Sequence, residues 1–186
     1  MDDKNNCVQT SKPANRKNVF FKALLSTLGS LVTAAAIIVL VCRFILPVFK
    51  VTGSSMEPTL SKGQTILCSK YADIKKGDVI AFYHNKKVLI KRIIAVQGDT
   101  VEILDNGTVR VNDCALDEPY ISRKALGECN TAFPFTVPDS RYFVMGDERE
   151  TSVDSRSSSV GCVAEENIIG KVYMKILPLD SFGKVK

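Results

Sequence analysis

The distribution of charged and apolar residues divides this chain of 186 residues into three parts. Between Ala23 and Cys42, twenty consecutive residues carry no charge. An α-helix rises 1.5 Å per residue, so one of that length reaches about 30 Å, the thickness of the hydrocarbon core of a bilayer. We therefore expect a basic tail over 1–22, a transmembrane anchor helix over 23–46 and a separate domain over 47–186.

Two other interpretations of the apolar run stay open. A cleaved secretory signal has a shorter apolar core and ends at small residues. Ala34 and Ala36 suit such a site, but cleavage there would leave six apolar residues at the new N-terminus. A helix buried in a soluble core is the second alternative, although twenty uncharged residues are long for one. The uncleaved anchor fits the pattern best.

After Pro47 the pattern changes to short β-branched and apolar runs separated by turn-forming residues. Asn106-Gly107 between two of these runs is a strong hairpin signal, because both residues accept positive φ angles. Without a long helical pattern between the runs, we expect a mainly β fold: an N-terminal transmembrane helix followed by an antiparallel β-rich domain. The expected strands are 49–51, 65–68, 78–83, 88–96, 100–104, 108–111 and 141–145.

The net charge of +5 lies mainly around the apolar run. Residues 1–46 carry six Lys or Arg against two Asp, whereas 47–186 carry nineteen basic against eighteen acidic residues. Basic residues concentrate on the cytoplasmic side of a span, so we expect a single-pass protein of the cell membrane with a cytoplasmic N-terminus and an extracytoplasmic domain. A nearly neutral domain does not attract nucleic acid, which we do not expect as a partner. The residues that set the orientation are Lys12, Arg16, Lys17 and Lys22, against Arg43 and Lys50.

The cysteines do not suggest a metal site. None of the six forms a Cys-x-x-Cys pair and the chain has one histidine, so we expect neither a metal nor another cofactor. A disulfide between Cys114 and Cys129 could close a loop in an exported domain, but spacing alone does not fix the pairing. The alternative is that the domain's cysteines are small buried hydrophobic residues, namely Cys68, Cys114, Cys129 and Cys162.

The candidate chemistry begins with Ser55, in the run Gly-Ser-Ser-Met-Glu-Pro-Thr at 53–59. A serine hydroxyl is a poor nucleophile unless a neighbouring base takes its proton. His84 is the one imidazole, but Lys91 lies in an apolar strand-like segment, where burial would lower the pKa of its amine and make it a neutral base. In a strand, Lys91 and Arg92 point to opposite faces, and alternation does not decide which of them faces inward.

Four motifs in order carry a resemblance to a known family. They are GxSMxPT at 53–59, KGDVIxF at 76–82, KRIIxVxGD at 91–99 and GDxRxxSxDSR at 146–156. These look like the signature boxes of bacterial type I signal peptidases (peptidase family S26), in the Gram-positive form with a single span. The resemblance covers 49–175, and its lesser matches are Glu118-Pro119-Tyr120 and Val137-Pro138.

The resemblance implies a membrane-bound serine endopeptidase that removes signal peptides from secreted preproteins at the outer face of the membrane. Ser55 would be the nucleophile and Lys91 its general base, forming a Ser/Lys dyad. Partners would be signal peptides and the lipid bilayer, with the secretion machinery as a candidate neighbour. The supporting residues that the last motif implies are Ser152, which would orient the amine, and Asp147, Asp154 and Arg156, which would form ion pairs and hydrogen bonds.

Signal peptides end in small-x-small sequences, so the family needs shallow apolar pockets for two small side chains. An extended peptide that adds to a sheet edge would present alternate side chains to such pockets. By resemblance, the pocket residues would be Phe49, Val51, Met56, Leu60, Leu89 and Ile90.

The chain departs from the family pattern at three places. Gly53 stands where the Gram-negative form has a hydroxyl that helps to bind the oxyanion, so the Ser55 backbone N–H or another donor would replace it. Glu148 stands where asparagine is usual and adds a negative charge beside Asp147. Three serines at 157–159 replace bulkier residues.

Three rival functions stay as alternatives. A self-cleaving Ser/Lys repressor would need a DNA-binding head, which residues 1–46 do not offer. A transpeptidase of the sortase kind would need cysteine with histidine and arginine, and no cysteine lies in a comparable motif. A non-enzymatic membrane-anchored β-domain, or an inactive relative, is the alternative from a different class.

Overall fold

The protein, described by a computed structural model over residues 16–185, forms two compact units that divide between Val41 and Cys42. Most of the expected basic tail, including Lys12, lies outside the described residues. The side chains of Arg16, Lys17, Cys42 and Arg43 are also outside the description.

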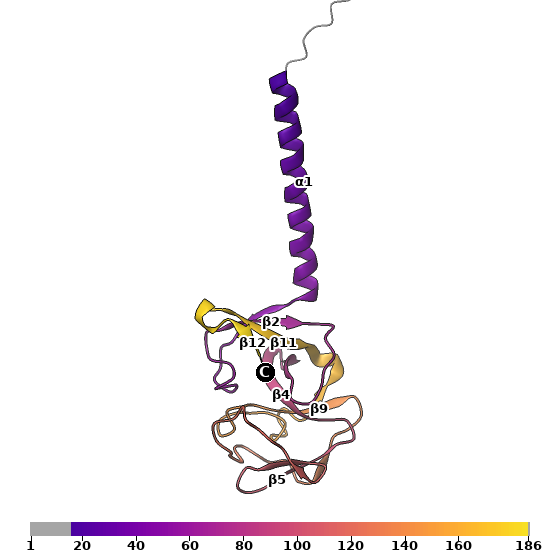
Figure 1. Ribbon diagram of the computed structural model, residues 1–186. Coiled ribbons are helices and arrows are strands. Elements are labelled where there is room, and N and C mark those ends of the chain that lie inside the picture. The colour runs from indigo at the N-terminus through magenta and orange to yellow at the C-terminus, as the bar shows by residue number, and fades with distance from the viewer. Residues whose placement is uncertain (1–15, 186) are drawn as a thin grey trace, which may run out of the picture. The chain divides into compact units, whose positions relative to one another are not determined.

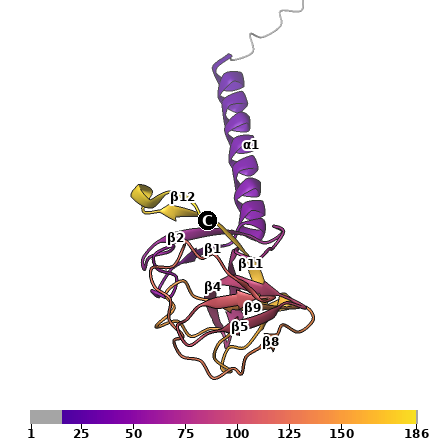
Figure 2. The same ribbon diagram turned by 60° about the horizontal axis from the view of Figure 1, so that its bottom comes forward.

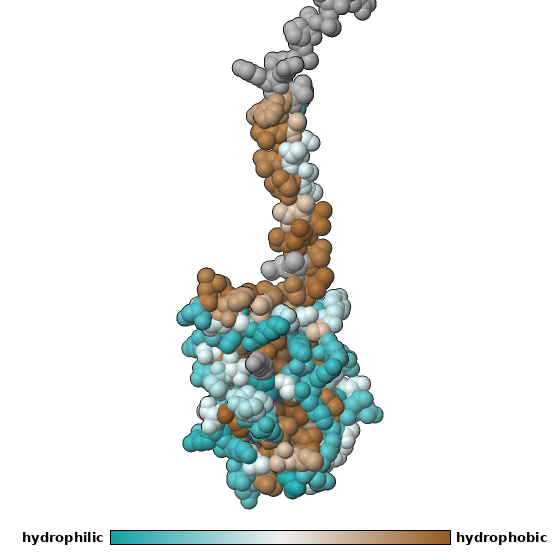
Figure 3. Space-filling view, viewed as in Figure 1, coloured by the Kyte–Doolittle hydropathy of each residue, from teal (hydrophilic) through white to brown (hydrophobic). Residues whose placement is uncertain are grey.

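The first unit is most of one long helix, α1 (Arg16–Ile45). Its segment Phe20–Val41 has a mean hydropathy of 2.4 and none of it is buried, so among the described residues it is the one helix long and apolar enough to cross a membrane. Apolar side chains dominate its surface (Figure 3). The hydroxyls of Thr27, Ser30 and Thr33 donate to helix carbonyls one turn back, which satisfies these polar groups without water.

The second unit is built from antiparallel strands in two sheets (Figures 1 and 2), so the predicted mainly β fold is confirmed. The larger sheet has the order β1-β2-β11-β3-β4-β9-β10, with β12 paired to β11, and the smaller has the order β7-β6-β5-β8. The larger sheet consists of β1 (Val48–Lys50), β2 (Thr65–Ser69), β3 (Val79–His84), β4 (Lys87–Val96), β9 (Arg141–Met145), β10 (Val163–Ala164), β11 (Ile168–Leu177) and β12 (Gly183–Lys184). The smaller sheet consists of β5 (Thr100–Ile103), β6 (Val109–Val111), β7 (Cys114–Ala115) and β8 (Phe135–Thr136). Two 3₁₀ turns complete the unit: η1 (Glu165–Asn167) and η2 (Leu179–Ser181).

The hairpin predicted at Asn106-Gly107 joins β5 to β6 and is confirmed. Gly107 has a φ of 80°, and a side chain there would collide with the backbone of Ala125. Its N–H donates to the carbonyl of Leu104, and the Asn106 side chain accepts from the N–H of Thr108. Glycine is therefore required both by the turn and by the close approach of another segment.

Strand β4 has one edge that is only partly paired. Its residues 87–92 pair with β3, whereas on the other side β9 begins at Arg92. Within the described chain, Val88 to Lys91 thus have no strand partner on that side. Two turn residues with positive φ, Asn85 and Lys86, set the register of the β3–β4 hairpin.

Strand β11 was absent from the sequence-based expectations, yet it lies between β2 and β3 in the larger sheet. Register shifts interrupt its pairing with β2 after Val172 and after Lys175. A bulged strand does not keep a strict period of two, so its alternation was not recognisable in the sequence.

The four cysteines after α1, all of them among the described residues, are free, so no disulfide joins Cys114 to Cys129. Cys68 is fully buried in the core around β2 and β3, and burial raises the pKa of its thiol to about 12. Cys129 and Cys162 are half-buried and Cys114 is exposed. The buried-hydrophobe alternative therefore holds fully for Cys68 alone among these four.

Candidate active site

Ser55 lies in the loop between β1 and β2. Two backbone hydrogen bonds close the base of this loop, from Val51 N–H to the Gln64 carbonyl and from Gly63 N–H to the Val51 carbonyl, each 2.8 Å. Ser55 is half-buried, and its carbonyl accepts a hydrogen bond of 3.1 Å from the Glu148 N–H. The loop is thus attached to the 146–156 segment through the backbone of the serine itself.

Lys91 lies in β4 and is only 3% exposed. Its Nζ donates a hydrogen bond of 2.8 Å to the hydroxyl of Ser152. Burial lowers the pKa of the amine to about 8; Asp154 and Asp147 oppose this shift, while Arg156 adds to it. At this pKa a minor fraction of the amine is neutral near physiological pH, and this fraction can act as a base.

The hydrogen bonds of Ser152 orient the lysine amine. The Ser152 hydroxyl donates to Asp154 Oδ2 at 2.7 Å, and it has a single proton to give. Towards Lys91 it can therefore act only as an acceptor. An N–H of the amine is thereby held towards Ser152, and the lone pair of the neutral form is left for another partner.

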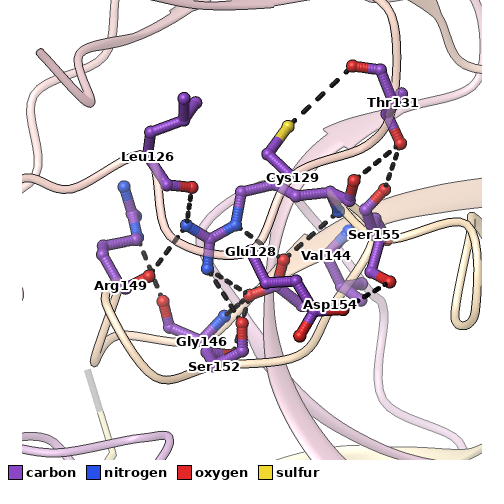
Figure 4. A network of polar contacts seen from close by, with 12 residues as sticks. Leu126, Glu128, Cys129, Thr131, Val144, Gly146, Arg149, Ser152, Asp154 and Ser155 are labelled. Carbon is purple, nitrogen blue, oxygen red and sulfur yellow. Dashed lines mark hydrogen bonds and ion pairs between the residues drawn. The ribbon is translucent and has the colours of Figure 1, made fainter. Parts of the chain in front are cut away.

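Asp154 is the centre of a buried network that shapes the 146–156 segment (Figure 4). Its Oδ2 accepts from the Gly146 N–H at 2.9 Å, and both its oxygens accept from the Arg156 guanidinium at 2.8 and 2.9 Å. Asp154 and Arg156 have fully buried side chains. A bidentate pair of this kind has a defined geometry, and removing one partner leaves an uncompensated charge.

Arg92, whose orientation the strand alternation left open, forms a second buried ion pair. The side chains of Arg92 and Asp147 are at most 2% exposed and form two hydrogen bonds of 2.7 and 2.8 Å. Thr59 donates to the same carboxylate and accepts from Arg92. Lys91 and Arg92 are thus both buried on opposite faces of β4, one facing Ser152 and the other a carboxylate.

Ser55 and Lys91 line the same cavity, which has a volume of about 160 Å³. Lys50, Thr52, Gly53 and Val88 complete its lining. Leu60 does not line it, because this residue is fully buried in the core beside Met56. The expected pocket residues that do line the cavity are Phe49, Val51, Met56, Leu89 and Ile90.

Two glycines border the site under opposite constraints. A Cβ at Gly146 would collide with the Ser152 hydroxyl and lie 2.5 Å from the Ser55 carbonyl oxygen, so the close packing of these two serines needs a residue without a side chain. A Cβ at Gly53 would meet nothing within 4 Å, so there is open space at the position where the Gram-negative form of the family has a hydroxyl.

His84 lies at the end of β3 and does not line the cavity. Its Nε2 is hydrogen-bonded to the side chain of Asn85 at 2.9 Å. Among the described residues, no group of three or more His, Cys, Asp or Glu side chains is placed to hold a metal.

Thr59 and Arg149 are two motif residues for which the sequence indicated no role, and Glu118 was a lesser match. Thr59 bonds to Asp147, and Arg149 forms a third buried ion pair, with Glu118. No local pattern pairs Glu118 with Arg149, because 31 residues separate them in the sequence.

The cavity thus brings together a half-buried serine and a buried lysine, two residue types that can act as nucleophile and base. The family model for signal peptidase, peptidase S26, matches residues 24–177. Signal peptidase IB of Staphylococcus aureus is 34% identical over 181 residues, which cover 87% of this chain and 93% of that protein. Signal peptidase I of Bacillus licheniformis is 30% identical over 186 residues, 93% of this chain and 97% of the relative. A crystal structure of a signal peptidase I from Enterococcus faecalis covers 54% of this chain and 97% of its own, at 29% identity and a TM-score of 0.46.

The chain belongs to the signal peptidase family, peptidase S26. It is a serine endopeptidase of the signal peptidase I type, and it removes signal peptides from preproteins.

Proposed function

We propose that the protein cleaves preproteins after small-x-small sequences by a Ser/Lys dyad. Lys91 takes the proton of the Ser55 hydroxyl as its oxygen attacks the scissile carbonyl carbon. The protonated amine then gives this proton to the departing amine of the mature protein, which leaves the signal peptide as an ester on Ser55. Lys91 next takes a proton from a water molecule as the water oxygen attacks the ester carbonyl carbon, and it returns this proton to the Ser55 oxygen as the signal peptide leaves.

The observation that carries this proposal is the shared cavity of Ser55 and Lys91, with the lysine buried and hydrogen-bonded to Ser152. Because Ser152 holds one N–H of the amine, the lone pair of the neutral form can turn towards the cavity that Ser55 also lines. Removal of the charge by burial is the physical condition for an amine to act as a base near neutral pH.

The unpaired edge of β4 supports the binding of an extended substrate. Val88 to Lys91 offer backbone groups on the side where β9 has not yet begun, and the same residues line the cavity. A substrate strand added here would form main-chain hydrogen bonds and direct alternate side chains into the cavity. The apolar side chains in the lining, Val51, Met56 and Ile90 among them, suit apolar side chains of the substrate.

The oxyanion of the tetrahedral intermediate needs hydrogen-bond donors. We propose the backbone N–H of Ser55 as the principal donor, because Gly53 supplies no hydroxyl. Glu148 is not placed to replace it: its N–H donates to the Ser55 carbonyl.

We also propose that α1 is an uncleaved anchor over 23–46, with residues 1–22 in the cytoplasm and 47–186 outside. The charge difference across the apolar segment supports this orientation. Only Leu46 and Pro47 separate α1 from β1, so the chain enters the catalytic unit directly after the span. This suits a substrate whose own apolar segment is still in the bilayer, delivered by secretion machinery that works nearby.

The test is cleavage of a synthetic peptide containing Ala-x-Ala by the full chain in detergent micelles. We expect cleavage directly after the second alanine, and loss of at least a thousandfold in kcat for Ser55→Ala and for Lys91→Met. His84→Ala is the matched control and should stay within a few-fold of the unmodified protein. A loss above about a hundredfold in His84→Ala would transfer the role of base to the imidazole, and full activity in Lys91→Met would refute the dyad.

A further inference from the structure

The long irregular segment between β7 and β8, residues 116–134, packs onto the 146–156 segment. The Leu126 carbonyl accepts a hydrogen bond of 2.6 Å from the Arg156 guanidinium. Gly127 has a φ of 63°, and a side chain there would collide with the Arg149 carbonyl and with Arg156. This close packing brings side chains from the 116–134 segment next to the elements that hold Ser152 (Figure 4).

Glu118 lies near the start of this segment, and its carboxylate is 1% exposed. Both of its oxygens accept hydrogen bonds from the fully buried guanidinium of Arg149. The Tyr120 hydroxyl donates to Glu118 at 3.2 Å, and the Tyr120 ring stacks on the Arg92 guanidinium at 4.0 Å. Removing two charges from water costs free energy. The hydrogen bonds among Glu118, Arg149 and Tyr120 offset this cost only while all of them are formed.

The third hydrogen bond of Arg149 leads to the candidate active site. Its Nε donates to the Gly146 carbonyl at 3.0 Å. Gly146 is the residue against which both the Ser55 carbonyl and the Ser152 hydroxyl pack, and Ser152 in turn accepts from the Lys91 amine. A displacement of Gly146 therefore moves the two halves of the proposed dyad relative to each other.

We propose that Glu118 is a positioning residue for peptide hydrolysis. It holds Arg149 in place, and Arg149 in turn holds Gly146 in the position that aligns the Ser55 hydroxyl with the Lys91 amine. This inference rests on the proposed Ser/Lys dyad. Neither Glu118 nor Arg149 lines the substrate cavity. Their loss should thus reduce kcat and leave KM nearly unchanged, because a displacement of about 1 Å at a reacting group can reduce the rate about a hundredfold.

The test compares kcat and KM of the full chain in detergent micelles, with the Ala-x-Ala peptide, for Glu118→Gln, Arg149→Lys and the double variant. A glutamine cannot accept from both terminal nitrogens of the Arg149 guanidinium with two oxygens, and a lysine at 149 cannot keep both the contact with Glu118 and the bond to Gly146. Each single variant should lose about 10- to 100-fold in kcat with KM within twofold. The double variant should lose no more than the worse single variant, because both changes break one chain of contacts.

Val101→Ala is the control for weakened folding, since Val101 is fully buried in a core cluster that contains none of the residues lining the cavity. It should lower Tm and leave kcat at 25 °C unchanged. The inference is overturned if Glu118→Gln behaves like this control, if its KM rises while kcat stays constant, or if the effects of the two single variants multiply.

If Glu118→Gln does not fold, Tyr120→Phe keeps the test decisive. It removes one hydrogen bond to Glu118 and keeps the ring on Arg92; we expect a twofold to fivefold loss in kcat, and no loss would overturn the inference. An active Ser55→Ala variant would refute the dyad, whereas an inactive Ser55→Ala beside fully active Glu118→Gln would refute only the positioning role.

Discussion

Replacing Lys91 by methionine should make the folded protein more stable at neutral pH while it abolishes hydrolysis. The amine is 3% exposed, and burial is the main cause that lowers its pKa from 10.5 to about 8. Below about pH 8 the amine is protonated in both the folded and the unfolded chain, so the folded state bears the full cost of the buried charge. Between about 8 and 10.5 this cost shrinks, and above 10.5 it vanishes, because the amine is neutral in both states.

The size of the effect follows from the two pKa values. The difference between 10.5 and about 8 corresponds to about 3 kcal/mol at neutral pH. Methionine has nearly the same length but loses the hydrogen bond to Ser152, which contributes about 1 kcal/mol. The net expectation for Lys91→Met is a gain of about 2 kcal/mol in the free energy of unfolding at pH 7, falling to a loss of about 1 kcal/mol at pH 10.5.

The assay is urea unfolding of the full chain in detergent micelles, followed by far-UV circular dichroism at pH 7 and at pH 10.5. Far-UV detection is suitable because the chain contains no tryptophan to report unfolding by fluorescence. Lys87→Met, at an exposed position on the same strand, is the matched control and should not be stabilised. A Lys91→Met variant that is less stable at pH 7, or whose advantage grows towards pH 10.5, would refute the buried-charge reasoning.

Three further predictions concern turnover of the Ala-x-Ala peptide. Because Lys91 acts as a base only when neutral, kcat/KM should fall about tenfold for each pH unit below about 8; a profile that stays flat down to pH 5 would contradict an amine base. Gly146→Ala should reduce kcat more than about a hundredfold, since its Cβ would displace Ser152 and the Ser55 carbonyl; activity within tenfold would show that the segment adapts. Gly53→Ser should raise kcat several-fold, because there is room for a hydroxyl near the oxyanion; Gly53→Ala, which adds bulk without a donor, is its control.

Much of the second unit was predictable because its strands follow local patterns. The runs 65–68, 78–83 and 88–96 correspond to β2, β3 and β4, and the Asn-Gly turn fixed the β5–β6 hairpin. β11 was missed because its bulges break the alternation on which the prediction depends. The order of strands in the sheets was also beyond the sequence pattern, since β11 enters between β2 and β3 from far along the chain.

The candidate site shows the same division between local and distant information. The motifs indicated Ser55, Lys91 and Ser152, and the structure adds the hydrogen bond between the last two. The partner of Arg149 could not be found in this way, because Glu118 belongs to an irregular segment whose Leu116 and Leu126 pack against the core of the smaller sheet. Leu60 was expected in the pocket by resemblance to the family, but it lies fully buried in the core.

The half-paired β4 strand has a consequence for how the protein behaves at high concentration. An open sheet edge beside an apolar cavity is also a template for self-association, in which one copy would extend the sheet of another. Lys86 and Lys87 are exposed at the start of this edge, and Lys50 lines the cavity. Their positive charges repel the same lysines of an approaching second copy. The same positive charges therefore help to keep the cleft free of other enzyme molecules and available to an incoming chain.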